Sequence, residues 1–289
     1  MEEWKSPIPK HVHFIWIGNQ DIPDYFMKYF KRSFEENMYP FKFTLWRNKD
    51  LTSTNFPKTY SYIQKIKKIH GKPMIGKDED GEDIIFIDSF GRQAYHNKWA
   101  QITDLMRLEI IYNHGGYYFD INFEILPSKG NHTIYNLLNS TKKRFVGCNE
   151  ISVEFEEWPY LSNSFFGATK HNPIMKRLLS KEYLQTIDIQ SGEIANETGP
   201  AYLRLGIYSN DSYHIFPYTY FYPFYEDPKF SNTNEKGRVI KPNKCHKGKT
   251  KNKSYHKLKN KKGYILFPCH NYPKSYALKH WELGKSWLT

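Results

Sequence analysis

The chain has 289 residues, a net charge of +12 and an unusually aromatic composition, with 17% Phe, Trp and Tyr. This length is enough for one large domain or two small ones. No run of about 18 apolar residues occurs, and segment 1–10 has no apolar stretch and is interrupted by prolines, so we predict neither a membrane span nor an export signal. Cys148, Cys245 and Cys269 lack the close spacing of disulfide frameworks or zinc sites, so we expect free thiols in a soluble, cytoplasmic protein.

Most of the positive charge lies in one segment. Residues 241–262 contain ten Lys and no acid, which leaves the rest of the chain at only +2. Such a segment is usually a solvated loop. The alternative is a contact with an acidic partner, such as RNA, an anionic surface or a phosphorylated acceptor. A basic nucleic-acid-binding protein is therefore one functional hypothesis, although no aromatic-spaced RNA motif supports it.

Hydrophobic patterning predicts strands that alternate with helices. Strands are predicted over 11–17, 41–46, 117–125, 144–148, 164–168, 213–216 and 264–267. Helices are predicted over 23–37, 57–70, 93–114, 172–184 and 199–208, and a polar loop over 71–84. The near-continuous apolar run 11–17 is typical of a strand covered on both faces. We therefore predict a doubly wound α/β architecture, with residues 1–289 forming a single domain.

The predicted helix 93–114 carries Asp104 and Arg107 one turn apart. Their side of the helix also holds Leu108 and Ile111, so it is expected to be partly covered. Charges in such a position need partners.

From 120 to 125 polar and apolar residues alternate, which places Asp120, Asn122 and Glu124 on one face of a predicted strand. The alternative is an ordinary half-buried strand with a solvated face. However, the apolar run Tyr117–Phe119 precedes Asp120, so the polar face opens where the strand leaves the core, and ligands bind at that edge of an open α/β sheet. Oxygen ligands suit Mg²⁺ or Mn²⁺ and leave coordination positions open for phosphate oxygens. The pattern favours sugar transfer from a nucleotide sugar.

Four sequence blocks together resemble a known family. They are I-P-K-H-V-H-F-I-W-I-G at 8–18, T-D-L-M-R at 103–107, G-G-Y-Y-F-D-I-N at 115–122 and H-W-E-L-G-K-S-W at 280–287. They resemble the Asp-x-Asp sugar-binding glycosyltransferases, which include α-1,6-mannosyltransferases and α-1,4-galactosyl- and N-acetylglucosaminyltransferases. The first block is also similar to the glucosyltransferase domain of large glucosylating toxins. The resemblance implies a GT-A-like fold, with a Rossmann-type doubly wound mixed sheet and peripheral helices, and retaining chemistry on a nucleotide-sugar donor.

The resemblance also implies roles for residues of the first two blocks. Trp16 would stack on the donor base, with the backbone near Phe14 and Ile15 holding the edge of the base. The alternative for Trp16 is a core aromatic. Asp104 and Arg107 would hydrogen-bond the hydroxyls of the donor sugar, and the alternative is a simple ion pair between them.

In the third block, the resemblance implies that Asp120 contacts the metal, the ribose or the donor sugar. Asn122 stands where the family has its second Asp, a metal ligand. Because an amide oxygen carries no charge, we expect weaker metal binding, for which Glu124 is a candidate compensation. Asn163, in S-N-S-F-F-G-A, and Thr198-Gly199-Pro200 also resemble blocks of the family. Asn163 is expected to line the sugar pocket, and Gly199-Pro200 to shape a turn and helix start.

For the C-terminal block, the resemblance implies a metal and diphosphate clamp. His280 would ligate the metal, Lys285 would contact the diphosphate, and Ser286 and Trp287 would close over the phosphates. The alternative is an amphipathic tail whose two Trp side chains dock in the core.

The resulting prediction is a hexosyltransferase that moves a sugar from a nucleotide-sugar donor to a hydroxyl acceptor, with Mn²⁺ or Mg²⁺ and with retention. A UDP-sugar is the favoured donor and GDP-mannose the alternative. The acceptor, whether glycan, protein or lipid, is not specified by the sequence. Asn122 keeps open a second hypothesis, a catalytically degenerate protein that binds a nucleotide sugar without turnover.

Overall fold

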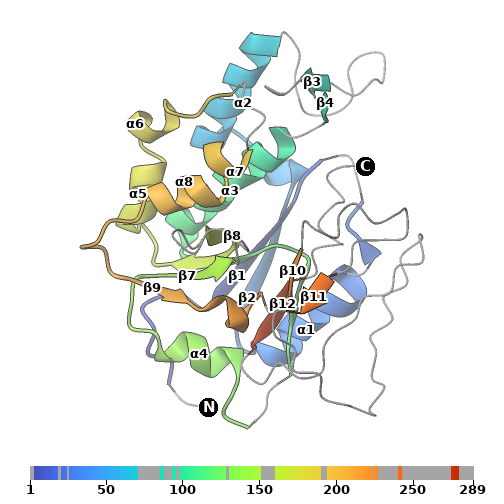
Figure 1. The fold of residues 1–289 in the computed structure, drawn as a ribbon, viewed down its shortest axis with the longest axis vertical. Coiled ribbons are helices and arrows are strands. Elements are labelled where there is room, and N and C mark those ends of the chain that lie inside the picture. The colour runs from blue at the N-terminus through green and yellow to red at the C-terminus, as the bar shows by residue number, and fades with distance from the viewer. Residues whose placement is uncertain are drawn as a thin grey trace.

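A six-stranded mixed sheet with the strand order β2-β1-β5-β8-β7-β9 forms the centre of the computed structural model (Figure 1). Residues 3–18, 21–24, 26–70, 85–87, 93–95, 98–127, 130–150, 160–189, 194–222, 224–226, 240–242 and 275–279 are described by the structure. The strands of the sheet are β1 (His11–Trp16), β2 (Lys42–Arg47), β5 (Gly116–Phe119), β7 (Phe145–Glu150), β8 (Tyr160–Ala168) and β9 (Tyr213–Phe216).

The remaining strands form three short antiparallel pairs. These are β3 (Ile85–Ile87) with β4 (Gln93–Tyr95), β10 (Phe224–Glu226) with β11 (Ile240–Pro242), and β6 (Phe123–Ile125) with β12 (Ala277–Lys279). The helices are the π-helix η1 (Phe26–Phe30), α1 (Lys31–Asn37), α2 (Pro57–His70), α3 (Lys98–His114), α4 (Ile134–Ser140), α5 (Pro173–Leu178), α6 (Lys181–Leu184), α7 (Ile194–Glu197) and α8 (Pro200–Leu205), with 3-10 turns at η2 (Asn48–Asp50) and η3 (Tyr218–Tyr220). None of the described helices is long and apolar enough to cross a membrane.

The direction of the strands confirms the predicted mixed α/β sheet. Strand β1 is parallel to both β2 and β5, and β7 is parallel to β9. Strand β8 is antiparallel to its neighbours β5 and β7, so it is the strand that makes the sheet mixed. The sheet is therefore parallel where β1 and β5 lie side by side.

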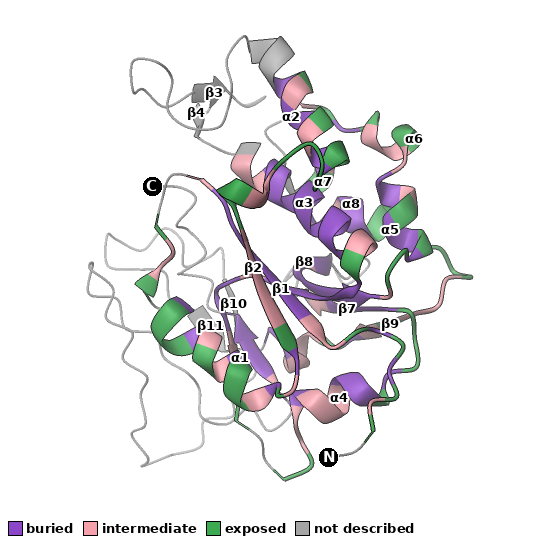
Figure 2. Ribbon diagram, turned by 180° about the vertical axis from the view of Figure 1, so that it is seen from behind, coloured by how far each residue is buried: buried purple, intermediate pink, exposed green. Residues whose placement is uncertain are grey.

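Both faces of the sheet are covered, as the predicted doubly wound architecture requires. Alternate residues of β1 enter two different core clusters: Phe14 packs with Phe26 of η1, whereas Ile15 packs in the cluster that contains Ile63 of α2 and Met106 of α3. Figure 2 shows α2, α3, α5 and α8 gathered over one face, with α1 and α4 towards the other. This two-sided burial explains the near-continuous apolar sequence of β1.

The connection from α3 to β5 depends on two glycines with positive φ, +66° at Gly115 and +98° at Gly116. A Cβ atom at Gly116 would collide with the carbonyl oxygen of His11 on β1. Glycine is therefore required here both by the backbone conformation and by the close approach of the two parallel strands.

Several predicted boundaries are wrong. The helix predicted over 93–114 begins at Lys98, because 93–95 form β4. The segment predicted as helix 172–184 is interrupted, because the Ser180 side chain accepts a hydrogen bond from the Tyr183 amide and starts α6 as a separate helix. The loop predicted over 71–84 and the strand predicted over 264–267 lie outside the described residues.

The prediction of one continuous strand over 117–125 is also wrong. Strand β5 ends at Phe119 and β6 begins at Phe123, with a turn between them in which the Phe123 amide donates to the Asp120 carbonyl at 3.2 Å. The turn lets β6 leave the main sheet and pair with β12. Asp120 therefore lies at the carboxyl end of β5, as expected, but Asp120, Asn122 and Glu124 do not share one strand face.

Candidate active site

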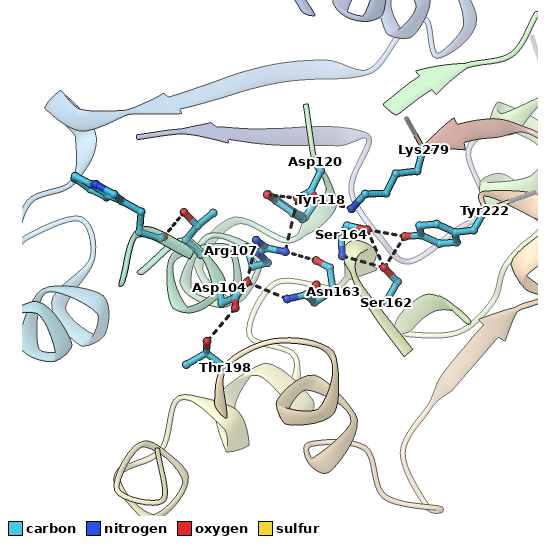
Figure 3. A network of polar contacts seen from close by, with 12 residues as sticks. Asp104, Arg107, Tyr118, Asp120, Ser162, Asn163, Ser164, Thr198, Tyr222 and Lys279 are labelled. Carbon is cyan, nitrogen blue, oxygen red and sulfur yellow. Dashed lines mark hydrogen bonds and ion pairs between the residues drawn. The ribbon is translucent and has the colours of Figure 1, made fainter. Parts of the chain in front are cut away.

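Four charged side chains meet at the carboxyl end of β5, and we call Asp104, Arg107, Asp120 and Lys279 the charged cluster (Figure 3). Asp104 and Arg107 come from α3, Asp120 follows β5, and Lys279 ends β12. Burying charged groups is unfavourable unless they are paired and hydrogen-bonded. The cluster meets this condition, because ion pairs link each carboxylate to at least one of the two cations.

Asp104 is the most enclosed carboxylate of the cluster, with a side chain that is 6% exposed. Its Oδ1 accepts hydrogen bonds from Asn163 Nδ2 at 2.9 Å and lies 3.0 Å from Arg107 Nη2. Its Oδ2 accepts from the Thr198 hydroxyl at 2.9 Å. Burial raises the pKa of Asp104 to about 6, although Arg107 and Thr198 favour the ionised form.

Arg107 connects the two carboxylates. Its Nη1 donates to the Asn163 carbonyl oxygen at 2.6 Å and lies 3.7 Å from Asp120 Oδ1. Its guanidinium carbon lies 4.6 Å from the centre of the Tyr118 ring. The planar guanidinium can make these contacts at once because its donors are held in a rigid fork.

Asp120 is the most exposed member of the cluster, with 20% of its side chain accessible. Its backbone amide donates to the Ser164 carbonyl at 2.9 Å, which anchors it beside β8. Its Oδ1 accepts from the Tyr118 hydroxyl at 2.8 Å and its Oδ2 from Lys279 Nζ at 2.8 Å. Burial alone would raise the pKa of Asp120, but Lys279 and Arg107 outweigh it and hold the pKa below its usual value. Asp120 is therefore ionised at neutral pH.

Lys279 is the member of the cluster that sequence analysis missed. Its side chain is only 9% exposed, and it reaches Asp120 because β12 pairs with β6, with Lys279 opposite Phe123 and Leu278 opposite Glu124. This pairing joins segments about 150 residues apart, a separation at which local periodicity carries no information. The nearest signal in the sequence was the block at 280–287, which begins one residue after Lys279.

Behind Asp120 lies a compact group of hydroxyls. Tyr222 and Ser162 are 2.7 Å apart, Ser162 and Ser164 2.8 Å, and Ser164 and Tyr222 3.0 Å, measured between hydroxyl oxygens. All three residues are buried. This network fixes the strand β8 against which Asp120 rests, because each buried hydroxyl has partners within the group.

Residues 23–142 match the model of a family described as "Glycosyltransferase sugar-binding region containing DXD motif". This match confirms the predicted family resemblance and the prediction of a glycosyltransferase. Asp104, Arg107 and Asp120 lie inside the matched segment, and Lys279 lies outside it.

Solved structures of other glycosyltransferases are similar to this chain. One is the PaToxG glycosyltransferase, at 16% identity, with 70% of each chain covered and a TM-score of 0.45. A second is the glycosyltransferase domain of the YGT toxin, at 11% identity, covering 69% of this chain and 77% of that chain with a TM-score of 0.37. A third is the catalytic domain of alpha-toxin from Clostridium novyi, at 13% identity, covering 62% of this chain and 59% of that chain with a TM-score of 0.36. No curated protein matches the chain in sequence.

The structure brings together four of the predicted site residues. Arg107 contacts Asp104, Asp120 and Asn163, and Asn163 also contacts Asp104, although these residues lie on a helix, after one strand and within another. Thr198, for which no contact was predicted, donates its hydroxyl to Asp104. The ion pair between Asp104 and Arg107, one of the two alternatives for these residues, is present.

Other predicted site residues lie elsewhere. Trp16 is buried in the core cluster that contains Phe14, which fits the alternative of a core aromatic, and Ile15 points to the opposite face. Asn122 is buried in the turn between β5 and β6. Stacking of Trp16 on a donor base stays a prediction.

The predicted C-terminal clamp for the metal and the diphosphate lies outside the described part of the chain. His280, Lys285, Ser286 and Trp287 lie outside the described residues, as does the basic segment 241–262 apart from the end of β11. The roles implied for these residues, and the nucleic-acid-binding hypothesis, stay predictions.

The described residues do not fit a divalent cation as they are arranged here. Such ions bind several oxygen ligands, but both oxygens of Asp120 already lie 2.8 Å from protein donors, Lys279 Nζ and the Tyr118 hydroxyl. The Lys279 ammonium, 2.8 Å from Asp120 Oδ2, would also repel a divalent ion bound to that carboxylate. Among the described residues there is no group of three or more His, Cys, Asp or Glu side chains that could hold a metal.

Proposed function

We propose that this protein transfers a sugar from a nucleoside diphosphate donor to a hydroxyl acceptor, with the charged cluster binding the donor sugar. The observation that carries the proposal is the array of Asp104, Arg107 and Asp120, enclosed at the carboxyl end of β5 within the matched segment. Ligands of open α/β sheets bind at this edge. Ionised groups retained in such an enclosed place are typical of functional sites.

Asp120 is the residue that we place in direct contact with the donor. It is ionised, it is the most accessible member of the cluster, and its neighbours hold it in a single orientation. A carboxylate at this point can accept hydrogen bonds from sugar hydroxyls. It can also stabilise positive charge that develops on the sugar as the bond to the diphosphate breaks.

We assign Asp104 and Arg107 the role of positioning Asp120. Their side chains are each 6% exposed, and most of their polar atoms already bind Asn163, Thr198 and each other. We propose that their remaining exposed atoms meet the donor sugar while the array keeps Asp120 in place. Such preorganisation costs no rearrangement during the reaction.

The finer features of the proposal follow from the family resemblance. We propose a UDP-sugar as donor, with GDP-mannose as the alternative, and retention of configuration at the anomeric carbon. In that reaction the acceptor attacks the face that the diphosphate leaves, and a leaving phosphate oxygen takes the proton of the acceptor hydroxyl. No protein nucleophile is then needed.

A second candidate function is a protein that binds a nucleotide sugar without turnover. Asn122 in place of the second Asp, together with the occupied oxygens of Asp120, favours it. Binding would still require the charged cluster, but the donor would remain intact.

The test is release of nucleoside diphosphate from a panel of UDP-, GDP- and dTDP-sugars, with binding to the same panel measured by thermal shift. We expect the parent protein to release diphosphate from one donor class and the Asp120→Ala variant to lose at least about 100-fold of that rate. Asp24→Ala, which breaks an exposed ion pair with Lys28, is the matched control and should retain the rate. Binding without release would favour the second candidate, and neither binding nor release would contradict both.

A further inference from the structure

We propose that Lys279 is the resident cation of this site, holding at Asp120 the place that the family resemblance gives to a divalent ion. The diphosphate of the donor would then meet the Lys279 ammonium at the end of β12. This inference rests on the proposed function, because it assigns the group that faces the leaving diphosphate.

The position of Lys279 is built into the fold. Strand β12 pairs with β6 over three residues, and the Lys279 amide also donates to the Phe221 carbonyl at 3.3 Å. The side chain passes Phe123, with Nζ 5.8 Å from the ring centre, and ends 2.8 Å from Asp120 Oδ2. Lysines at the surface usually extend into solvent, whereas this one is 9% exposed and directed at a carboxylate.

Among the residues that the structure describes, the charges of the cluster balance with Lys279 in place. Asp104 and Asp120 supply two negative charges, and Arg107 and Lys279 supply two positive charges. An Asp-x-Asp motif would add a third carboxylate, but this chain has Asn122 at that position. Compared with an Asp-x-Asp site, one negative charge is absent at Asn122 and one positive charge is supplied by Lys279 of β12. Both differences reduce the affinity for a divalent ion.

Lys279 can serve the transfer reaction chemically. An ammonium has three N–H donors and can bridge a carboxylate and a phosphate oxygen. When the bond from the anomeric carbon to the diphosphate oxygen breaks, its electron pair stays on the diphosphate, where the ammonium stabilises the added charge. The acceptor oxygen forms the new bond to that carbon, and its proton passes to a phosphate oxygen, so atoms and charge balance.

The first test is diphosphate release by the full chain in the presence of a chelator. We expect the parent to keep its rate in EDTA, Lys279→Met to lose at least about 100-fold, and Lys279→Arg, which keeps the charge, to stay within about tenfold of the parent. Lys28→Met, which removes an exposed lysine paired with Asp24, is the matched control and should be unchanged. Thermal melting of each variant shows whether a loss of rate reflects unfolding.

The second test is Mn²⁺ binding, measured by titration calorimetry and electron paramagnetic resonance without any donor. The parent should bind Mn²⁺ no more tightly than the Lys28→Met control, whereas the double variant Lys279→Met with Asn122→Asp should bind it at least about tenfold more tightly. This readout does not depend on activity, so it separates the role of Lys279 from the proposed function.

Two results would overturn the inference. One is loss of diphosphate release by the parent protein in EDTA, with recovery of the rate on addition of Mn²⁺. The other is a double variant that folds as the parent does and shows no gain in Mn²⁺ binding.

Discussion

The two ends of strand β5 differ in the charge state of their ionisable side chains. At its carboxyl end, the charged cluster keeps two carboxylates and two cations in contact. At its amino end, three histidines, which we call the histidine cluster, gather around the starts of β1 and β5: His11, His13 and His114. Ring centres of His11 and His13 are 3.9 Å apart, and those of His13 and His114 are 5.9 Å apart.

The histidine cluster is neutral, and both ring nitrogens of its central member His13 are hydrogen-bonded. His13 Nδ1 accepts a hydrogen bond from Trp46 Nε1 at 3.2 Å, which leaves the proton on Nε2 to be donated to the Gly115 carbonyl at 2.9 Å. Burial, followed by the neighbouring His11, lowers the pKa of His13 to about 3. Burial and Lys42 lower the pKa of His11 to about 4. These rings therefore act as polar packing groups at neutral pH.

The difference indicates which end of the strand serves function. Neutral groups with complete hydrogen bonds add little strain to a fold, whereas buried ion pairs are often replaceable by apolar residues without loss of stability. We therefore propose that the four charged groups at the carboxyl end of β5 serve donor binding rather than folding alone. The predictions below test this contrast, from the largest expected effect to the smallest.

Removing the central cation of the charged cluster should have the largest effect on stability. Arg107→Met leaves Asp104 and Asp120 without their shared partner, and loss of one member of a buried ion pair typically costs about 3–5 kcal/mol in the free energy of unfolding. Urea denaturation measures the change. Arg32→Met, which breaks an exposed pair with Glu36, is the control. A variant at Arg107 as stable as this control would show that the cluster is not an interdependent unit.

The histidine cluster should control stability in acid. Because the pKa of His13 is lowered when the protein folds, the unfolded chain binds the extra proton first, and stability present above about pH 6.5 is lost as the pH falls towards 3. One such group contributes a slope of about 1.4 kcal/mol per pH unit. Asp104 acts in the opposite sense, because its pKa is raised to about 6 and the folded state takes up that proton first.

The contribution of His13 is therefore measured as a difference between two proteins. The free energy of unfolding of the parent and of His13→Gln is measured from pH 7 to 4. It should fall less steeply with pH in the variant, since glutamine keeps a donor and an acceptor but does not titrate. Diphosphate release at pH 7.5, corrected for the folded fraction, should be equal in the two proteins. Parallel stability curves would contradict the assignment of acid sensitivity to the histidine cluster.

The smallest effect is expected at the edge of the charged cluster. Thr198→Val removes the hydroxyl that donates to Asp104 Oδ2 and should cost about 1.5–3 kcal/mol, as for a hydrogen bond to a charged acceptor. Thr198→Ser keeps the hydroxyl and should recover most of that loss in the same denaturation experiment. Equal destabilisation by both variants would assign the effect to the methyl group and its packing.

The sequence predicted the architecture well where patterns are local. The apolar run of β1, the helix α3 and the glycines before β5 placed Asp104, Arg107 and Asp120 at one edge of a two-sided sheet. Strict alternation after Asp120 was misleading, because a turn and a short strand can carry the same alternation as one long strand.

Long-range pairing was the part that could not be predicted. Lys279 reaches Asp120 only because β12 adds to β6, and no local periodicity in 275–279 indicates that partner. No role was predicted for the Thr198 hydroxyl, because its contact with Asp104 depends on how α8 packs on β8. Sequence patterns therefore predict only part of a site that is assembled from distant segments.

Hydrogen exchange with and without a bound nucleotide sugar tests the central claim most directly, because it compares the two ends of β5 in one experiment. With the donor that gives the largest thermal shift, we predict slower amide exchange in Asp120–Ile125 and Ala277–Lys279, and no change in His11–His13 or His114–Gly115. Protection at the histidine end, or saturated binding with no protection near Asp120, would contradict the placement of the donor at the charged cluster.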